Sequence, residues 1–151
     1  MRKFAIILSI LFLVGFDLIS KAYIESILPM SEYIPLFSEY LWFKISYNTG
    51  IAFSLPIEGL LLKSITLILL VGIIGLYIKE EYPKNSRFMD MGYTLILSGA
   101  ISHAYERIYI WHVVDFIAVK YFAILNFADI FISVGAFFLV IAYGFHARSR
   151  S

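Results

Sequence analysis

The amino-acid sequence predicts an all-α membrane protein with four transmembrane helices and a small extracytoplasmic β-hairpin or cradle. Two observations lead to this class. Of the 151 residues, 61% are hydrophobic and only 15% are charged, and the mean hydropathy is +0.85. A soluble domain is about 45–50% apolar and about 25% charged. Long apolar stretches also recur along the chain, and a helix needs about 20 such residues to cross the hydrocarbon core.

Four apolar stretches fit membrane spans in a single polytopic domain that covers residues 1–151. We expect the spans at about residues 4–23, 59–78, 89–108 and 124–147. The first follows Arg2 and Lys3 like a signal peptide, but it lacks a small-x-small cleavage site, so we expect a retained helix. Only Lys63 interrupts the second stretch and only Asp129 the fourth. Helices are expected because lipid offers no partner to the free backbone groups of an isolated sheet.

The distribution of Lys and Arg predicts that both termini face the cytoplasm. In that orientation the inner side carries 7 basic and 3 acidic residues, and the outer side carries 5 basic and 8 acidic residues. Cytoplasmic loops of membrane proteins carry the excess of Lys and Arg.

Two segments then lie outside the membrane, at about residues 24–57 and 109–123. Within the first, residues 40–47 are rich in strand formers, Asn48-Thr49-Gly50 suits a turn, and residues 51–55 suit a second strand. This pattern predicts a small aromatic hairpin on the outer membrane surface.

Several ionisable residues fall near the outer ends of the predicted spans. They are Asp17, Lys21, Lys63, Glu106, Arg107 and Asp129. A charge within a span is costly, so a cluster on one side indicates a shared polar site. Snorkelling to the interface would explain Lys63, but the side chains of Asp17 and Asp129 are too short for it. Asp17 and Lys21 are spaced to pair on one face of the first helix.

The composition excludes several kinds of chemistry. The chain has no cysteine, which removes thiolate catalysis and disulfides, and the net charge of +1 does not favour nucleic-acid binding. We expect no metal and no cofactor, because no zinc or nucleotide motif is present and His103 and His112 lie nine residues apart.

Two aspartates remain as candidates for catalysis. Asp115 and Asp129 both sit among apolar residues at the outer end of the last two spans. Two neighbouring carboxylates share a proton, so the ionised member can activate water while the protonated member polarises a carbonyl. This pair would suit peptide hydrolysis without a covalent intermediate. The alternative is structural, with one aspartate as a helix cap and the other as an interfacial charge.

Taken in order, five segments resemble lipoprotein signal peptidase, or signal peptidase II. They are Asp17-Leu18-Ile19-Ser20-Lys21, residues 47–54, Arg107, Val113-Val114-Asp115-Phe116-Ile117, and Asn126-Phe127-Ala128-Asp129. The resemblance implies an aspartic peptidase of the bacterial inner membrane with its active site at the extracytoplasmic face. Such enzymes remove the signal peptide from diacylglyceryl-modified prolipoproteins, just before the lipidated Cys, and are targets of globomycin-type cyclic peptides.

Carried over by position, the resemblance makes Asp115 and Asp129 the catalytic dyad. It gives Asn48, Arg107 and Asn126 a role in binding substrate or ordering the dyad, and Asp17 and Lys21 a structural role. The family usually shows a Gly-Asn-x-x-Asp-Arg pattern where this chain has residues 102–107. His103 therefore replaces the amide, and Glu106 replaces the shorter acid. We expect His103 to join the residues that bind substrate or support the dyad.

Two non-enzymatic alternatives remain open from the sequence. A proton-coupled carrier subunit would use intramembrane acids as a relay, but the ionisable residues gather at one side. An inactive lipid-binding relative would be consistent with the altered residues 102–107, but both aspartates are retained. The small size suggests a monomer. The apolar spans imply contact with membrane lipid, and the resemblance implies a lipidated substrate.

Overall fold

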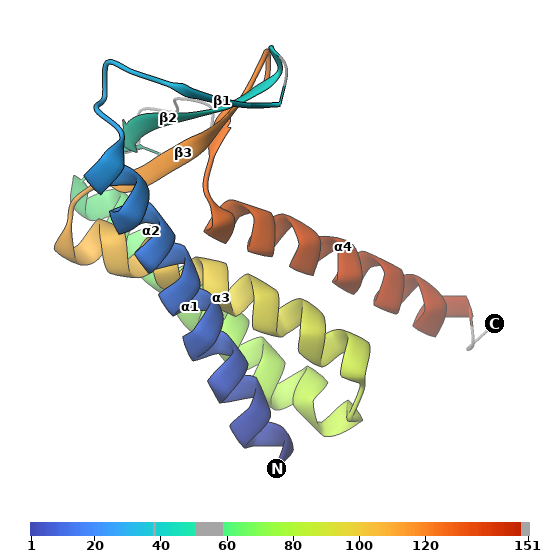
Figure 1. Ribbon diagram of the computed structural model, residues 1–151. Helices are drawn as coiled ribbons and strands as arrows, with labels where there is room; N and C mark the ends of the chain where they lie inside the picture. Colours follow the sequence, from blue (N-terminus) through green and yellow to red (C-terminus); the bar gives the residue numbers. More distant parts are fainter. Residues whose placement is uncertain (38, 51–58, 149–151) are drawn as a thin grey trace.

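The protein folds as a bundle of helices with a small sheet at one end (Figure 1). The computed structural model describes residues 1–37, 39–50 and 59–148. The long helices are α1 (Arg2–Ile27), α2 (Gly59–Leu76), α3 (Arg87–Tyr109) and α4 (Phe127–Arg148). A π-helix, η2 (Tyr77–Glu81), and a 3-10 turn, η3 (Tyr82–Lys84), continue α2. The strands are β1 (Ile34–Phe37), β2 (Leu41–Asn48), β3 (Val113–Val119) and β4 (Ile124–Leu125).

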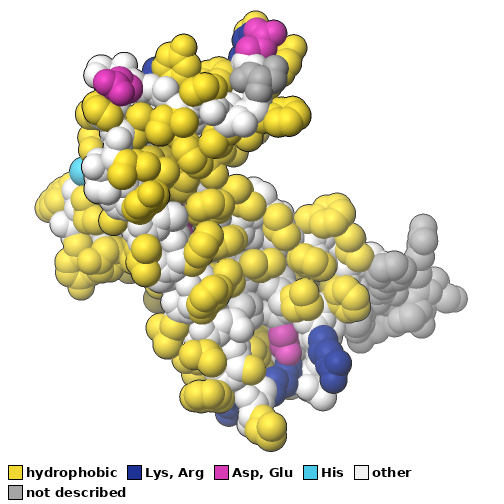
Figure 2. Space-filling model, in the orientation of Figure 1, with side chains coloured by type: hydrophobic (Ala, Val, Ile, Leu, Met, Phe, Trp, Pro, Cys, Tyr) yellow, Lys and Arg dark blue, Asp and Glu magenta, His cyan; other side chains and the backbone are white. Residues whose placement is uncertain are grey.

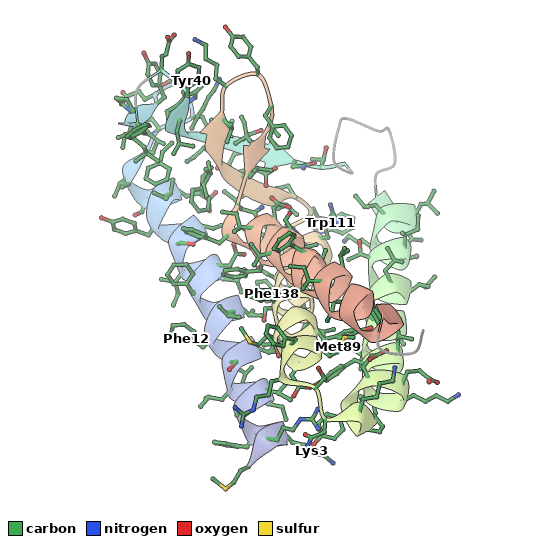
Figure 3. The ribbon with its side chains drawn as sticks, turned by 90° about the vertical axis from the view of Figure 1, so that its right-hand side faces the viewer. Lys3, Phe12, Tyr40, Met89, Trp111 and Phe138 are labelled. Carbon is green, nitrogen blue, oxygen red and sulfur yellow. The ribbon has the colours of Figure 1, made fainter. Side chains whose placement is uncertain are left out.

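Three segments in the described part of the chain are long and apolar enough to cross a membrane. They are Arg2–Ile27, Gly59–Lys84 and Phe127–Gly144. Most of their side chains face outward; Phe12, for example, is 68% exposed and projects from α1 away from the bundle (Figure 3). Figure 2 shows hydrophobic side chains over much of one face of the molecule. An apolar surface of this extent fits a lipid environment.

The third predicted span forms helix α3, but α3 is not among these three apolar segments. The physical reason is its position, since α3 contacts α1, α2 and α4. Its buried residues include Thr94, Ser98, Ser102 and Glu106, which lower the mean hydropathy of the helix. These polar groups face protein, where they can find partners.

Helices α3 and α4 approach closely because glycines lie between them. A Cβ at Gly99 would overlap the backbone oxygen of Ala128, and a Cβ at Gly135 would lie 2.7 Å from the oxygen of Gly92. Small residues allow helix backbones this close together in membrane proteins. The contact at Gly99 fixes the beginning of α4, where Asp129 lies.

The sequence predicts a two-stranded hairpin, whereas the structure contains a four-stranded sheet. The strand expected at residues 40–47 is present as β2, whereas residues 51–55 lie outside the described residues. Strand β2 pairs with β1 and β3, in a four-stranded antiparallel sheet of order β1-β2-β3-β4. Strand β3 comes from the second segment that we predicted to lie outside the membrane, where no strand was expected. Most of its residues are buried. The chain is therefore mostly helical rather than all-α.

The sheet is attached to the C-terminal end of α1 through an apolar cluster. Ile24 and Leu28 pack with Ile45 of β2 and Phe116 of β3. At the opposite end, where Lys3 lies in Figure 3, Arg2 donates two hydrogen bonds of 2.7 Å to Asp90 of α3. Each end of α1 is thus tied to the rest of the fold.

Candidate active site

Asp115 occupies a buried position in the middle of β3, between two amides. The residue is 6% exposed. Its Oδ2 accepts a hydrogen bond from Asn48 Nδ2 at 3.1 Å, and its Oδ1 accepts one from Asn126 Nδ2 at 2.6 Å. Asn48 pairs with Val113 across the sheet, so its side chain is on the same face as that of Asp115, two residues further on. The oxygen of the Asn48 amide accepts the N–H of Gly50, which orients the amide.

Asp129 lies in the first turn of α4, in a reciprocal capping arrangement. Asn126 precedes the helix, and its Oδ1 accepts the N–H of Asp129 at 3.0 Å. In return, Asp129 Oδ2 accepts the N–H of Asn126 at 3.0 Å. This is the capping-box pattern, with Asp in place of the usual Glu or Gln. The cap holds Oδ2 and leaves Oδ1 for other contacts, and the Asp129 side chain is 32% exposed.

Asn126 therefore contacts both aspartates, through its side-chain amide to Asp115 and its backbone N–H to Asp129. The residue itself is fully buried. Burial raises the pKa of Asp115 to about 6, and the negative charge of Asp129 adds to this effect. The hydrogen bonds from Asn48 and Asn126 act in the opposite direction. Two acids in one site with different surroundings can divide the roles of acid and base.

His103 of α3 reaches the same site. Its Nε2 lies 3.1 Å from Asp129 Oδ1, and its Nδ1 lies 4.0 Å from Glu106 Oε2. The side chain is 11% exposed. His103 thus contacts the oxygen of Asp129 that the helix cap leaves available.

A buried ionic cluster supports the two aspartates from the side of α1. Lys21 Nζ lies 2.6 Å from Asp17 Oδ2 and 2.6 Å from Glu106 Oε2. Asp17 also accepts the hydroxyl of Ser102 and, at 2.9 Å, the N–H of Ala128 in the first turn of α4. Glu106 Oε1 accepts the N–H of Val114, next to Asp115, at 3.0 Å. The cluster therefore positions the backbone beside both aspartates.

Arg107 points toward α2 and the end of β2. Its Nη2 donates to the backbone oxygen of Gly50 at 3.1 Å, and its Nη1 donates to Thr66 Oγ1 at 3.3 Å. It lines a cavity of about 210 Å³ together with Thr49, Gly59, Leu62, Lys63 and Trp111. Lys63 donates to the backbone oxygen of Ile108, and its ammonium group lies 2.9 Å from the centre of the Trp111 ring.

Comparison with known proteins identifies the family. A model of signal peptidase II matches residues 9–145. The chain belongs to the signal peptidase II family. A lipoprotein signal peptidase of Pseudomonas fluorescens is 33% identical over 145 residues, covering 90% of this chain and 84% of that protein. Another, of Streptococcus pneumoniae (strain ATCC BAA-255 / R6), is 33% identical over 146 residues, covering 94% of each chain.

Two solved structures of bacterial membrane enzymes are similar to this signal peptidase II fold. One matches with a TM-score of 0.86 and 25% identity, over 97% of this chain and 92% of that chain. The other matches with a TM-score of 0.79 and 26% identity, over 92% of each chain.

Most residues singled out in this signal peptidase II sequence lie in one connected site. The contacts join Asp115, Asp129, Asn48, Asn126, His103, Asp17 and Lys21. Arg107 is joined to them less directly, through Gly50 and the Asn48 amide. The sequence analysis missed Ser102 and the pairing of Glu106 with Lys21. Nothing in the spacing indicates these contacts, because they join residues 85 positions apart.

Proposed function

We propose that this member of the signal peptidase II family is a membrane aspartic endopeptidase that removes signal peptides from lipoproteins. The observation that carries the proposal is the double contact of Asn126, which ties Asp115 and Asp129 into one unit. The negative charge of Asp129 also contributes to the raised pKa of Asp115, so the two carboxyl groups interact electrostatically. The family match is the second support, and it favours an enzyme over a carrier subunit.

In the proposed reaction, the ionised aspartate takes a proton from a water molecule, and the water oxygen attacks the scissile carbonyl carbon. The protonated aspartate gives its proton to the carbonyl oxygen, which produces a tetrahedral diol. The diol then collapses as the C–N bond breaks. The leaving nitrogen receives the proton taken from water, and the second aspartate recovers its own proton from the diol. Both carboxyl groups return to their starting states, and no covalent enzyme intermediate forms.

The proposed substrate is a prolipoprotein whose Cys carries diacylglycerol, with the cut just before that Cys. The exposed apolar faces of α1, α2 and α4 would be in contact with membrane lipid, so a lipidated substrate could approach within the bilayer. Asn48 and Arg107 are the proposed groups for binding the substrate backbone, next to the dyad. Globomycin-type cyclic peptides are the proposed inhibitors, and a monomer is the proposed active form.

The proposed arrangement in the membrane has four spans, with α3 as the central one, and both termini in the cytoplasm. Burial of the polar residues of α3 against the other helices supports this, because lipid would then meet the outer helices. The dyad and the sheet would lie at the extracytoplasmic side of a bacterial inner membrane. A positive excess at the cytoplasmic side supports the orientation.

The deciding experiment is a cleavage assay with purified protein in detergent and a diacylated prolipoprotein. Wild-type protein is expected to release the signal peptide, and Asp115→Asn and Asp129→Asn variants of equal helicity are expected to be inactive. Asp90→Asn is a matched control, because this aspartate lies at the other end of α3 and pairs with Arg2. A well-folded wild-type protein that leaves the substrate intact would favour an inactive relative.

A further inference from the structure

His103 lies on the one side of Asp129 that the helix cap does not occupy. Asp129 Oδ2 is taken by the N–H of Asn126, and Oδ1 faces His103 Nε2 at 3.1 Å. An ionised carboxylate only accepts hydrogen bonds. The geometry therefore requires the proton of the ring on Nε2 whenever Asp129 is ionised.

The two cations nearest to the ring on α1 and α3 bind other groups, which leaves the imidazole as the side-chain donor to Asp129 Oδ1. Lys21 is within 2.6 Å of both Asp17 and Glu106, so its ammonium group is already shared between two carboxylates. Arg107, the next cation on α3, donates to Gly50 and Thr66. The Nδ1 atom of His103 is buried, makes no hydrogen bond within the described residues, and lies 4.0 Å from Glu106 Oε2.

Charged groups from four elements belong to the same site. Asp17 and Lys21 come from α1, Glu106 and Arg107 from α3, Asp115 from β3, and Asp129 from α4. The partners of the two dyad members differ in kind. Asp115 is held by two neutral amides, from Asn48 and Asn126, whereas Asp129 is held by a backbone N–H and an imidazole. Among these four partners, the imidazole is the ionisable one.

We propose that His103 is a positioning residue that keeps Asp129 as the ionised, water-activating member of the pair and leaves the exchangeable proton on Asp115. This inference rests on the proposed peptidase function and adds the division of roles within the dyad. His103 acts through Asp129 and does not itself contact the reacting atoms. A second proton, on Nδ1, would put a positive charge beside Asp129 and weaken it as a base, so protonation of the ring reduces activity.

The test uses two substitutions at position 103 and one matched control. In His103→Gln the side-chain amide can place an N–H near the former Nε2 position, but it does not titrate. In His103→Leu no donor remains. His112→Gln removes another imidazole beyond the outer end of α3, where it contacts the Tyr47 ring. Full-length variants are compared in detergent for kcat, KM and pH profile, with helicity and unfolding temperature as checks on folding.

A lost hydrogen bond to a charged group corresponds to about a 10- to 100-fold effect, and we expect His103→Leu to lose that much in kcat with little change in KM. We expect His103→Gln to recover most of the lost kcat and to stay active at lower pH than wild type. The control is expected to keep the wild-type pH profile. A second measurement needs no activity: in protein with ¹⁵N-labelled histidine, Asp129→Asn is expected to shift the Nε2 resonance of His103.

The inference is overturned by a folded His103→Leu variant with wild-type kcat, or by a His103→Gln variant as inactive as His103→Leu. If His103→Leu does not fold, an unchanged pH profile in His103→Gln overturns it. Failure of the peptidase function itself is a separate result, because it appears as an inactive wild-type protein. If the wild type cleaves the substrate and both aspartate variants do not, the peptidase function stands. The His103 variants then test the role of His103 alone.

Discussion

Lys21 Nζ lies 2.6 Å from Glu106 Oε2, and this contact joins α1 to α3 across 85 residues of sequence. Both side chains are almost completely buried, and so is Asp17, the second partner of Lys21. The positive charge of Lys21 is thus shared between two buried carboxylates. This cluster fixes the C-terminal half of α1 against the two segments that carry Asp115 and Asp129.

Removing the central cation should therefore destabilise the fold. Breaking a buried ion pair costs about 3–5 kcal/mol, and we expect a loss of that size for Lys21→Met in the free energy of unfolding. Thermal unfolding in detergent measures the effect as a lower midpoint temperature. Lys63→Met is the matched control. Lys63 contacts the Trp111 ring at a partly buried site, so its loss should cost about 1 kcal/mol. Equal midpoints for the two variants would contradict a supporting role for the cluster.

Local patterns in the sequence predicted the parts of the site that depend on near neighbours. The spacing of Asp17 and Lys21 predicted their pairing, and the chemistry of Asp115 and Asp129 marked them as candidates. The pairing of Asn48 with Asp115 spans 67 residues, so no local pattern could specify it. The resemblance to signal peptidase II suggested Asn48 as a site residue but not its contact.

The sheet and α3 were predicted less completely for physical reasons. Strand β3 is buried and nearly all apolar, so it lacks the alternation that marks a half-exposed strand. Its pairing with β2 also depends on contacts far apart in the sequence. In α3 the polar residues face other helices, which makes the segment less apolar than a helix that faces lipid.

Asn126 has two separable roles, and substitutions can divide them. Its Oδ1 caps α4 and its Nδ2 donates to Asp115. Asn126→Ser keeps a capping oxygen but loses the amide N–H that reaches Asp115, so we expect a smaller loss of stability than in Asn126→Ala and a loss of about 10-fold or more in kcat. Asn126→Ala loses both, and a missing cap adds about 1 kcal/mol of destabilisation. Unfolding temperature and kcat are measured on the same preparations. A fully active Asn126→Ala variant would show that neither contact matters for the dyad.

The raised pKa of Asp115 predicts how activity declines as the pH rises. Burial, followed by the charge of Asp129, moves this pKa from 3.8 to about 6. As the proton donor of the proposed reaction, Asp115 must be protonated. The kcat/KM of the free enzyme should therefore fall as the pH rises through about 6.

The charge of Asp129 is the second cause of the raised pKa of Asp115, and Asp129→Asn tests it. The measurement does not require an active enzyme. Removing the negative charge should lower the pKa of Asp115, so its proton should leave at lower pH than in wild type. Burial is the larger cause and remains, so the pKa should stay above the ordinary value. The infrared band of the protonated carboxyl, followed against pH, measures this. An unchanged midpoint would mean that the two carboxyl groups are not electrostatically coupled.

The contact between α3 and α4 predicts that Gly99 matters for activity although it carries no functional group. A Cβ there would overlap the backbone oxygen of Ala128, one residue before Asp129. Because this neighbour is backbone, the start of α4 must move, and the contacts of Asp129 with Asn126 and His103 must change with it. We expect Gly99→Ala to lose most of the kcat, since small displacements of catalytic groups cost about 100-fold.

Gly72→Ala on α2 is the matched control for this substitution. Among the described residues, nothing lies within 4 Å of a Cβ at Gly72, and alanine favours a helix over glycine by about 1 kcal/mol. The control should therefore keep wild-type kcat and unfold at the same or a slightly higher temperature. Loss of activity in Gly99→Ala alone would mean that close packing of α3 and α4 sets the position of Asp129. Equal activity in both variants would instead mean that α4 can shift without disturbing the dyad.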